Sequence, residues 1–516
     1  MLQPAPSWAA LRAGFDWALP ARLNMAAQAC DDWAARDPDR LAILDPVLGD
    51  VSNAGLRAMA DALALAMAGR GITRGARVGV LRSQSAWTAA AHLAVWKLGA
   101  ISIPLFKLFG PDALLTRLND SGAALVIGDV EGHPGLAAWG GPVLVPEEAP
   151  LPQGQCQTAD TGPEDPAVLI YTSGTTGAPK GALHGHQILT GHLPGVEASH
   201  DFLGQQDDRL WTPADWAWIG GLFDVLMPGL ALGVPVVAAR MPRFTVEDCL
   251  RIVRESTVRN VFFPPTALRM LKAEGARLPG LRSVASGGEP LGAEMLDWGR
   301  DALGLTINEF YGQTECNMVA TSCAAMFPAR PGCIGQAVPG YELAVLDGAG
   351  QPCDGEGDIA VRRGGASMML GYWNRPEATA EKYRGDWMLT GDRGQWEGDF
   401  LRFVGREDDV ITSAGYRIGP SEIEDCLLRH PAVATVGVVG KPDALRTEIV
   451  KAYVVPRAGV AADADLARAL QDFVKERLAR HSYPREITFL DALPMTVTGK
   501  IIRKDLKAMA CSEAGQ

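Results

Sequence analysis

Residues 171–181 read Tyr-Thr-Ser-Gly-Thr-Thr-Gly-Ala-Pro-Lys-Gly and directly follow the apolar run 167–170. Glycines let backbone N–H groups turn toward an anion, hydroxyl groups donate to phosphate oxygens, and the lysine adds a mobile positive charge. The segment therefore predicts a loop that follows a buried strand and holds a polyphosphate. It lacks the Gly-Lys-Ser/Thr ending of a Walker A loop. A flexible linker rich in glycine and serine is the competing interpretation.

Around this loop, strand-like and helix-like runs alternate. We expect strands at 41–44, 77–81, 100–104, 124–127, 234–238 and 260–263, and helices at 53–69 and 86–98. Apolar strands separated by helices indicate parallel sheets that are covered on both faces. The predicted fold class is α/β, with a large N-terminal domain of mostly parallel sheets and helices.

A change of character near Gly405 predicts a second domain. Beyond it we expect helices at 421–429 and 463–479 and strands at 433–439, 448–455 and 486–490, which together make a small α+β unit. The expected boundaries are 1–405 for the N-terminal domain, 406–410 for a hinge and 411–516 for a mobile C-terminal domain. A short polar connection would let the two parts reorient as rigid bodies.

The composition excludes several classes of protein. A chain of 516 residues with 47% apolar and 21% charged residues is typical of a globular protein with more than one domain. The formal net charge of −12 argues against a general binder of nucleic acid or of anionic membranes. The apolar stretch 216–239 contains Pro228 and Pro235, which favour a buried helix and strand over a membrane span. We expect no integral membrane association.

The metal-ligating residues show no recognisable set. Nine cysteines are scattered without a Cys-x-x-Cys pair, and the eight histidines form no His-Glu-x-x-His arrangement. This pattern fits reduced thiols better than a disulfide framework or a zinc site. No secretory signal is recognisable at the N-terminus, so we expect a cytoplasmic protein.

Four further segments carry groups that suit a nucleotide. They are 286–290 (Ser-Gly-Gly-Glu-Pro), 308–315 (Asn-Glu-Phe-Tyr-Gly-Gln-Thr-Glu), 389–392 with 403–406, and 495–503, which places Lys500 after a glycine. Tyr311 beside a glycine offers a stacking surface for a purine, and Glu315 is a hard oxygen donor suited to Mg²⁺. Asp392 and Arg406 are suited to clamp a ribose diol. Each segment alone has an ordinary structural interpretation, but their joint order does not.

With these residues in place, the chain resembles the adenylate-forming (AMP-binding) acyl-CoA synthetase superfamily over nearly its whole length. That superfamily also includes luciferases and nonribosomal adenylation domains. The matching motifs are 171–181, 311–315, 390–392, 405–406 and 498–500. Segments 310–315, 412–420 and 481–485 look closest to the short- and medium-chain branch. Two departures are Ala414 and Met495, where a serine and a lysine are common; they leave the chemistry intact but put the affinity for CoA in doubt.

The resemblance implies a two-step reaction that uses ATP, Mg²⁺ and coenzyme A. A carboxylate first attacks the α-phosphate of ATP, and the thiol of CoA then displaces AMP. Lys500 would be the adenylation lysine, Lys180 would hold the β- and γ-phosphates, and Glu315 with Thr172 would bind Mg²⁺. The nucleotide-binding residues implied in this way are Thr172, Ser173, Gly174, Thr175, Thr176, Gly177, Gly287, Gly288, Glu289, Glu309, Tyr311, Gly312, Gln313, Thr314, Asp392 and Arg406.

The second step is implied by residues of the C-terminal domain. Asp408 stands at the hinge position, although a solvated turn is the alternative. The positions that match CoA contacts are Gly415, Tyr416, Arg417, Arg446, Tyr483, Pro484 and Arg485. Their arginines would meet the phosphates of CoA, with surface ion pairing as the competing role. His184 and His186 are either core residues or substrate contacts.

The acid is expected to lie against a tryptophan-rich segment. By the resemblance, the wall of the acyl pocket comprises Trp211, Asp215, Trp216, Trp218, Gly220, Gly221 and Gly312, with core packing as the competing role for each tryptophan. Acetyl-CoA synthetases resemble this chain but carry a tryptophan where Gly312 stands, so a deeper pocket is expected here. Each further buried methylene adds roughly 0.8 kcal/mol, which predicts acids from propionate to octanoate above acetate.

Three other functions stay open at this point. They are an aryl-acid–CoA ligase, a stand-alone adenylation enzyme that loads a carrier protein, and a luciferase-like oxidase. A catalytically silent nucleotide-binding protein is the alternative from a different class, and Lys500, Glu315 and Asp392 argue against it. The expected partners are a small carboxylic acid, ATP and CoA, with no nucleic acid. The oligomeric state stays open, with a homo-oligomer among the outcomes.

Overall fold

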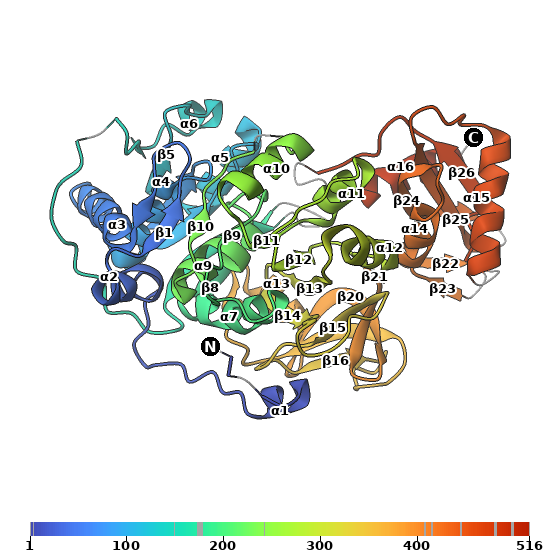
Figure 1. Ribbon diagram of the computed structural model, residues 1–516, viewed down its shortest axis with the longest axis horizontal. Coiled ribbons are helices and arrows are strands. Elements are labelled where there is room, and N and C mark those ends of the chain that lie inside the picture. The colour runs from blue at the N-terminus through green and yellow to red at the C-terminus, as the bar shows by residue number, and fades with distance from the viewer. Residues whose placement is uncertain are drawn as a thin grey trace.

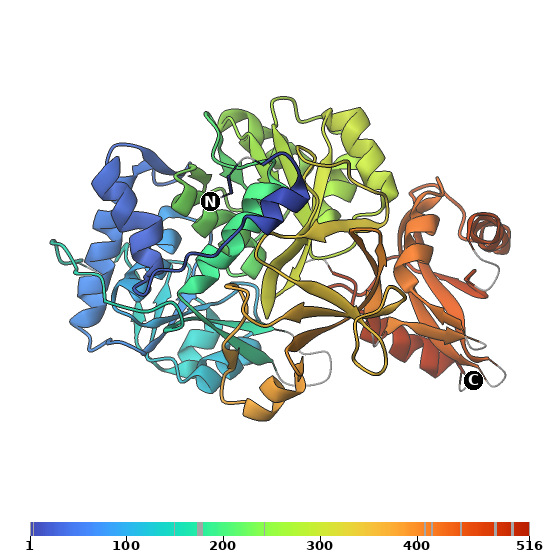
Figure 2. The same ribbon diagram turned by 90° about the horizontal axis from the view of Figure 1, so that it is seen from below.

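A computed structural model describes residues 2–3, 5–148, 150–172, 179–241, 243–406, 409–413, 416–443, 446–478, 482–496 and 500–514. Figure 1 shows a large part that carries most of the chain and a smaller C-terminal unit at one end of the long axis. Figure 2, turned by 90°, shows the same separation. Among the described residues, no helix combines the length and apolarity that crossing a membrane requires.

The first sheet carries the predicted phosphate loop at its edge. Its strand order is β18-β8-β7-β4-β3-β5-β6. The bounds are β3 (Arg77–Leu81), β4 (Ile101–Pro104), β5 (Leu125–Gly128), β6 (Val143–Leu144), β7 (Pro166–Thr172), β8 (Lys180–Gly185) and β18 (Gly371–Tyr372). Strands β3 to β7 pair in parallel, as the alternating pattern predicts, whereas β8 returns antiparallel to β7 with Thr172 opposite Lys180.

Helices α3 (Asn53–Ala68), α4 (Ala86–Lys97), α5 (Pro111–Ser121) and α6 (Pro134–Trp139) follow the strands of this sheet. Ser52 and Ser85 begin α3 and α4, since each hydroxyl accepts a hydrogen bond from a free backbone N–H of the first turn. Near the N-terminus of the chain lie α1 (Trp8–Ala13), η1 (Ala27–Asp31) and α2 (Asp32–Arg36).

The second sheet continues from parallel into antiparallel strands. Its order is β16-β17-β20-β21-β15-β14-β13-β12-β11-β9-β10-β1-β2, and β19 pairs with β20. The parallel half comprises β1 (Leu41–Leu44), β9 (Leu210–Trp211), β10 (Val236–Val237), β11 (Asn260–Phe262), β12 (Ser283–Gly287) and β13 (Ile307–Gln313), with β2 (Val51–Ser52) antiparallel at its edge. From β13 onward the strands are antiparallel.

The sequence pattern does not predict this antiparallel half. It comprises β14 (Cys316–Thr321), β15 (Cys333–Ala337), β16 (Leu343–Leu346), β17 (Gly357–Arg362), β19 (Tyr383–Arg384), β20 (Trp387–Glu397) and β21 (Phe400–Arg406). The hairpin of β20 and β21 sets Asp392 opposite Arg406, which brings together the carboxylate and guanidinium expected to clamp a ribose.

The helices that accompany the second sheet include one that is buried on every side. Their bounds are α7 (Gln187–Ser199), α8 (Ile219–Gly221), η2 (Leu222–Leu226), α9 (Met227–Leu232), α10 (Val246–Glu255), α11 (Pro265–Ala273), α12 (Ala293–Trp298), η3 (Gly299–Leu303) and α13 (Pro376–Glu381). Helix α7 is buried at all but its first residue. The expected buried helix and strand at 216–239 are present as α8, η2, α9 and β10.

The C-terminal unit has its own sheet and core. Strands β22 (Ile411–Ser413), β23 (Tyr416–Ile418), β24 (Val433–Asp443), β25 (Thr447–Pro456) and β26 (Glu486–Phe489) form the sheet. Helices α14 (Pro420–Leu428) and α15 (Ala464–Arg477) lie close to the predicted ranges, whereas α16 (Arg503–Ala514) was not predicted. Ile423, Val436 and Leu470 are among its core residues. Helix α15 lies on the side away from the large part (Figures 1 and 2).

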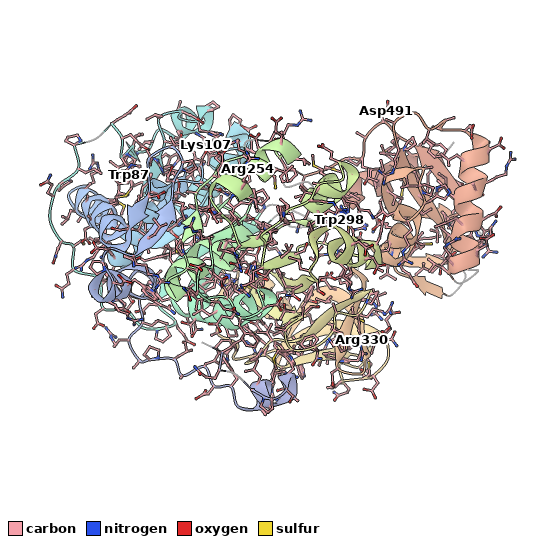
Figure 3. The ribbon with its side chains drawn as sticks, viewed as in Figure 1. Trp87, Lys107, Arg254, Trp298, Arg330 and Asp491 are labelled. Carbon is pink, nitrogen blue, oxygen red and sulfur yellow. The ribbon has the colours of Figure 1, made fainter. Side chains whose placement is uncertain are left out.

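A cleft runs between the two parts. Gly292 and Arg269 line it on one side, and Asp425 and Arg457 line it on the other. An adjoining hollow is lined by Trp298 of the large part and Arg429 of the C-terminal unit, and Figure 3 shows Trp298 on the side that faces that unit. The contact is close, because a Cβ on Gly292 would lie 3.0 Å from Oδ1 of Asp425.

Candidate active site

Lys500 reaches from the C-terminal unit into the large part. Thr496 holds its backbone, since the N–H of Lys500 donates to Oγ1 of Thr496 (3.0 Å) and its carbonyl accepts from the N–H of Thr496 (2.7 Å). The amine lies 5.3 Å from the centroid of the Trp218 ring, in cation–π range. A Cβ on Gly288 would lie 3.2 Å from the Trp218 ring and 3.5 Å from Lys500 Nζ, and the φ of +97° at Gly288 is a conformation that favours glycine.

The charges around this amine belong to the segments that the sequence singled out. Burial lowers the pKa of Lys500, Arg406 lowers it further, and the carboxylates of Glu289 and Asp392 oppose the effect. Glu289 is in turn paired with Arg269 at 3.1 Å. The structure therefore brings Lys500, Glu289, Asp392 and Arg406 to one place from four separate stretches of the chain.

Asp392 is fixed by its neighbours. Its Oδ2 accepts from the hydroxyl of Tyr311 (2.5 Å), its backbone N–H donates to Oγ1 of Thr390 (3.1 Å), and Nε of Arg406 lies 3.7 Å from its Oδ1. Burial raises the pKa of Asp392, while Arg406 and the Tyr311 hydrogen bond oppose that rise. The geometry presents a carboxylate beside a half-exposed guanidinium, which suits a pair of vicinal hydroxyl groups.

Glu315 and Lys180 meet at Tyr372, a residue that sequence reasoning missed. The hydroxyl of Tyr372 donates to Oε1 of Glu315 (2.5 Å), and Lys180 Nζ lies 5.3 Å from the centroid of the same ring. Tyr372 arrives through the pairing of β18 with β8, where it stands opposite Ala182. No local signal marks a tyrosine that far from the other motifs; only the strand pairing places it. Thr172 is near, with its hydroxyl donating weakly to the carbonyl of Lys180 (3.4 Å).

Of the residues expected at the adenine site, one packs closely against an aromatic ring and two make hydrogen bonds to other segments. Gly287 packs so closely on the ring of Phe310 that a Cβ would lie 2.5 Å from it. Glu309 is buried, and its Oε1 accepts from the N–H of Leu291 (3.0 Å). Burial raises the pKa of Glu309 to about 8. Gln313 bonds the carbonyl of Thr390 at 2.9 Å and so ties β13 to β20.

Of the three tryptophans in the expected acyl wall, Trp218 alone contacts the Lys500 amine among the described residues. Its ring lies 5.8 Å from that of Phe262, which lies 5.1 Å from Phe310. Trp211 and Trp216 are fully buried core residues, the alternative that the sequence left open. Asp215 accepts from the N–H of Ala217 (2.8 Å).

The glycines of the expected wall sit where backbones or rings approach closely. A Cβ on Gly220 would lie 2.9 Å from the Trp218 ring, and a Cβ on Gly221 would lie 2.3 Å from the carbonyl of Asp215. A Cβ on Gly312 would lie 2.1 Å from Oδ1 of Asn317, so the space beside Gly312 holds the Asn317 carboxamide. The side chain of Asn317 therefore adjoins the expected acyl wall at Gly312.

His184 and His186 are both core residues. Burial lowers the pKa of His184 to about 3 and that of His186 to about 4, so both rings are neutral at pH 7. Nδ1 of His186 accepts from the N–H of Met25 (3.1 Å), which gives this ring a structural role.

Several expected residues lie outside what the structure describes. These are Ser173, Gly174, Thr175, Thr176 and Gly177 of the phosphate loop, Asp408 of the hinge and Gly415, together with the side chains of Tyr416 and Arg417. Of the other residues expected to contact CoA, Tyr483 carries Lys475 and Arg485 against its ring (4.5 and 5.1 Å), and the N–H of Arg446 donates to Asp443 (2.8 Å).

Comparison with protein families gives two matches. Residues 30–373 match the family described as AMP-binding enzyme, and residues 422–500 match the AMP-binding enzyme C-terminal domain. Similar proteins include the acetyl-coenzyme A synthetase of Bacillus subtilis (strain 168), which is 33% identical over 85% of this chain and 81% of its own length. The mitochondrial acyl-coenzyme A synthetase ACSM2 of Rattus norvegicus is 32% identical over 96% of this chain and 93% of its own.

Solved structures of similar proteins share the fold. An acyl-CoA synthetase from Brucella canis has a TM-score of 0.75 and 33% identity, covering 99% of this chain and 100% of its own. The anthranilate CoA ligase AuaEII in complex with anthranoyl-AMP has a TM-score of 0.88 and 26% identity, covering 97% of this chain and 100% of its own.

Proposed function

Because the chain belongs to the AMP-binding enzyme family, it is an AMP-forming acid–thiol ligase, and we propose that Lys500 drives its first step on a short- or medium-chain acid. The enzyme converts a carboxylic acid, ATP and CoA into acyl-CoA, AMP and pyrophosphate. The two similar proteins from Bacillus subtilis and Rattus norvegicus are an acetyl-CoA and an acyl-CoA synthetase, so we favour an acyl-CoA synthetase over a carrier-protein loading enzyme or an aryl-acid ligase. The observation that carries the proposal is the enclosure of the Lys500 amine beside Trp218 and Gly288.

In the first step an oxygen of the carboxylate attacks the α-phosphorus, and the bond to the β-phosphate breaks so that pyrophosphate leaves. Two anions must approach each other, and the ammonium of Lys500 would neutralise the negative charge that collects between them. Its enclosure strengthens this effect, since a charge acts more strongly where water is excluded. Asp392 and Arg406 would hold the ribose, and Lys180 would lie along the outer phosphates.

The residues near Tyr372 fit a magnesium ion. Glu315 is a buried carboxylate whose Oε1 is oriented by the Tyr372 hydroxyl, and hard carboxylate oxygens suit Mg²⁺. Bound Mg²⁺ would supply charge neutralisation at the phosphates, with Glu315 and Thr172 as its protein contacts. Tyr372 would fix the direction of Glu315, a role that becomes measurable when its hydroxyl is removed.

For the second step we propose that the C-terminal domain, residues 411–516, turns about a hinge at 406–410 that includes Asp408. The sulfur of CoA then attacks the acyl carbonyl carbon and AMP leaves. The turn would withdraw Lys500 and present Gly415, Tyr416 and Arg417, with Arg446, Tyr483, Pro484 and Arg485 meeting the nucleotide part of CoA. Support comes from the position of Lys500 on the small unit while its partners lie on the large one.

A panel of carboxylic acids in an assay of AMP release tests the acyl preference. We expect acids from propionate to octanoate to give a higher kcat/KM than acetate, and the highest kcat/KM with acetate would contradict this proposal. We place the reaction in the cytoplasm, where the free cysteines stay reduced. A homo-oligomer is a further proposal, which the mass of the purified enzyme in solution tests.

A further inference from the structure

Three polar side chains form a buried cluster behind the hairpin that carries Gly312 and Glu315. His192 comes from α7, Asp224 from η2 and Asn317 from β14, and none is more than 4% exposed. Nδ1 of His192 lies 3.0 Å from Oδ1 of Asp224. Nδ2 of Asn317 donates to both carboxylate oxygens at 2.8 and 3.0 Å. We call His192, Asp224 and Asn317 the polar cluster.

The polar cluster offers two hydrogen-bond acceptors. The carboxylate of Asp224 can only accept hydrogen bonds, so His192 directs an N–H at Nδ1 toward it, and Nε2 is the acceptor nitrogen of that tautomer. Among the described residues, His192 Nε2 is a buried atom without a hydrogen-bond partner. Asn317 bonds Asp224 through Nδ2, so its Oδ1 is a second acceptor in the same cluster. Buried polar atoms are nearly always paired, and an unpaired one is costly, so Nε2 of His192 calls for a donor that the described residues do not supply.

The polar cluster adjoins the expected acyl wall. Oδ1 of Asn317 would lie 2.1 Å from a Cβ on Gly312. A helical run of α8 and η2 leads from Trp218, which contacts the Lys500 amine, to Asp224. Six residues at the α-helical rise would span roughly 9 Å, and the π-helical η2 shortens this span, so the carboxylate end of a bound acid and the polar cluster lie apart by no more than the length of a medium-chain acid.

We propose that the acid activated by this enzyme carries a hydrogen-bond donor, a hydroxyl or an amino group, at the end away from its carboxylate. His192 Nε2 and Asn317 Oδ1 accept from that group and so determine specificity. An amino group would in addition offset the buried charge of Asp224, since a buried charge is stabilised by an opposite one. The inference rests on the proposed function and refines it by naming the substrate class.

The test compares hexanoate with ω-hydroxyhexanoate and ω-aminohexanoate, using kcat/KM for AMP release by the full-length enzyme. A site that pairs with a donor disfavours the analogue that lacks the donor. We therefore expect kcat/KM for the better of the two polar acids to be at least about 10-fold higher than kcat/KM for hexanoate. His192→Phe keeps an aromatic ring of similar size but removes Nε2, and Asn317→Ala removes Oδ1. Each of these two variants should lower the ratio of kcat/KM for the polar acid to kcat/KM for hexanoate to about one or below.

His92→Phe is the matched control, because His92 is another buried histidine, stacked on Trp96 and outside the polar cluster. It should leave the ratio as in the parent. A preference of the parent enzyme for hexanoate, or a ratio that both cluster variants leave unchanged, would overturn this inference while leaving the proposed function intact. If no carboxylic acid supports AMP release, the proposed function falls, and this inference falls with it.

Discussion

At the scale of single residues, Tyr372 deserves a direct experiment because its hydroxyl is the described partner of Glu315 Oε1. Tyr372→Phe keeps the ring beside Lys180 but leaves a buried carboxylate with one donor fewer. Losing a hydrogen bond to a charged group costs about 1.5–3 kcal/mol, so we expect the Mg²⁺ concentration for half-maximal pyrophosphate exchange to rise by roughly 10-fold. Tyr383→Phe is the control, since its ring contacts Arg363. An unchanged Mg²⁺ requirement would contradict the assigned role.

Titration of Glu309 gives a second prediction at this scale. Its pKa is raised by burial to about 8, so the folded protein holds a proton that the unfolded chain releases above the usual carboxyl range. The stabilisation is complete below the unfolded pKa and is lost as pH rises to about 8. Glu309→Gln stays neutral, so its Tm should fall less between pH 5 and pH 8 than that of the parent.

The exposed substitution Glu148→Gln is the control for this titration and should reproduce the parental Tm profile. If Tm of Glu309→Gln falls between pH 5 and pH 8 as much as that of the parent, the Glu309 carboxyl is not the cause of the fall, which would contradict this prediction. Asp425, whose pKa burial raises to about 7, contributes a decline of the same sign, so some pH dependence should persist.

At the scale of secondary-structure elements, the hairpin of β13 and β14 depends on Gly312. A methyl group there would lie 2.1 Å from Oδ1 of Asn317, so Gly312→Ala forces the two strands apart. Overpacking of this kind typically costs about 1–3 kcal/mol, and we expect a lower Tm. Adding Asn317→Gly should restore part of the loss, because it removes Oδ1 and Cγ but leaves the Cα of residue 317 at 2.9 Å and removes the hydrogen bonds to Asp224. Additive effects in this double-mutant cycle would contradict the close contact.

The elements also show why some features could be predicted and others could not. Strands β3 to β5 and helices α3 and α4 follow from local apolar runs and serine caps, which lie within short windows of sequence. The motifs that carry Lys500, Asp392 and Glu315 were recognised because each has its own distinctive residues. Tyr372 was missed because its place depends on the pairing of β18 with the distant strand β8. Asn317 was missed because its partner Asp224 comes from η2, far away in the chain.

Packing between distant segments also decides which tryptophan of the 211–218 segment lies at the site. Trp211, Trp216 and Trp218 look alike in the sequence, and only packing decides that Trp218 contacts the Lys500 amine while the other two fill the core. The antiparallel half of the second sheet was not predicted. Some of its strands pair with the next strand in the chain, such as β20 with β21, but others pair across longer separations, such as β15 with β21 and β17 with β20.

At the scale of the whole molecule, Asp425 of the C-terminal unit lies close to Gly292 of the large part in the arrangement in which Lys500 reaches the large part. Asp425→Arg would place a longer cation against Arg269 and Lys272 of the cleft. Like charges at an interface cost several kcal/mol, so acyl-AMP formation should fall by at least about 10-fold. Transfer of the acyl group from supplied acyl-AMP to CoA should change little, because the proposed second step uses another arrangement.

Asp472→Arg makes the same change of charge on the exposed face of α15 and is the control for this experiment. Stopped-flow measurement of the two half-reactions separates them. A parallel loss of both in Asp425→Arg would indicate a general defect and would contradict the proposal that the observed arrangement serves only the first step.

The most direct test of the whole account is the carboxylate-dependent exchange of pyrophosphate into ATP by Lys500→Gln. The substitution removes the one charge that reaches across the cleft to Trp218 and Gly288 in the described structure. Loss of a transition-state charge contact costs about 100-fold or more, so exchange should collapse while the Kd for ATP stays within a few-fold of the parent. Lys504→Gln, on the exposed face of α16, should exchange at the parental rate. Parental exchange by Lys500→Gln would contradict the account.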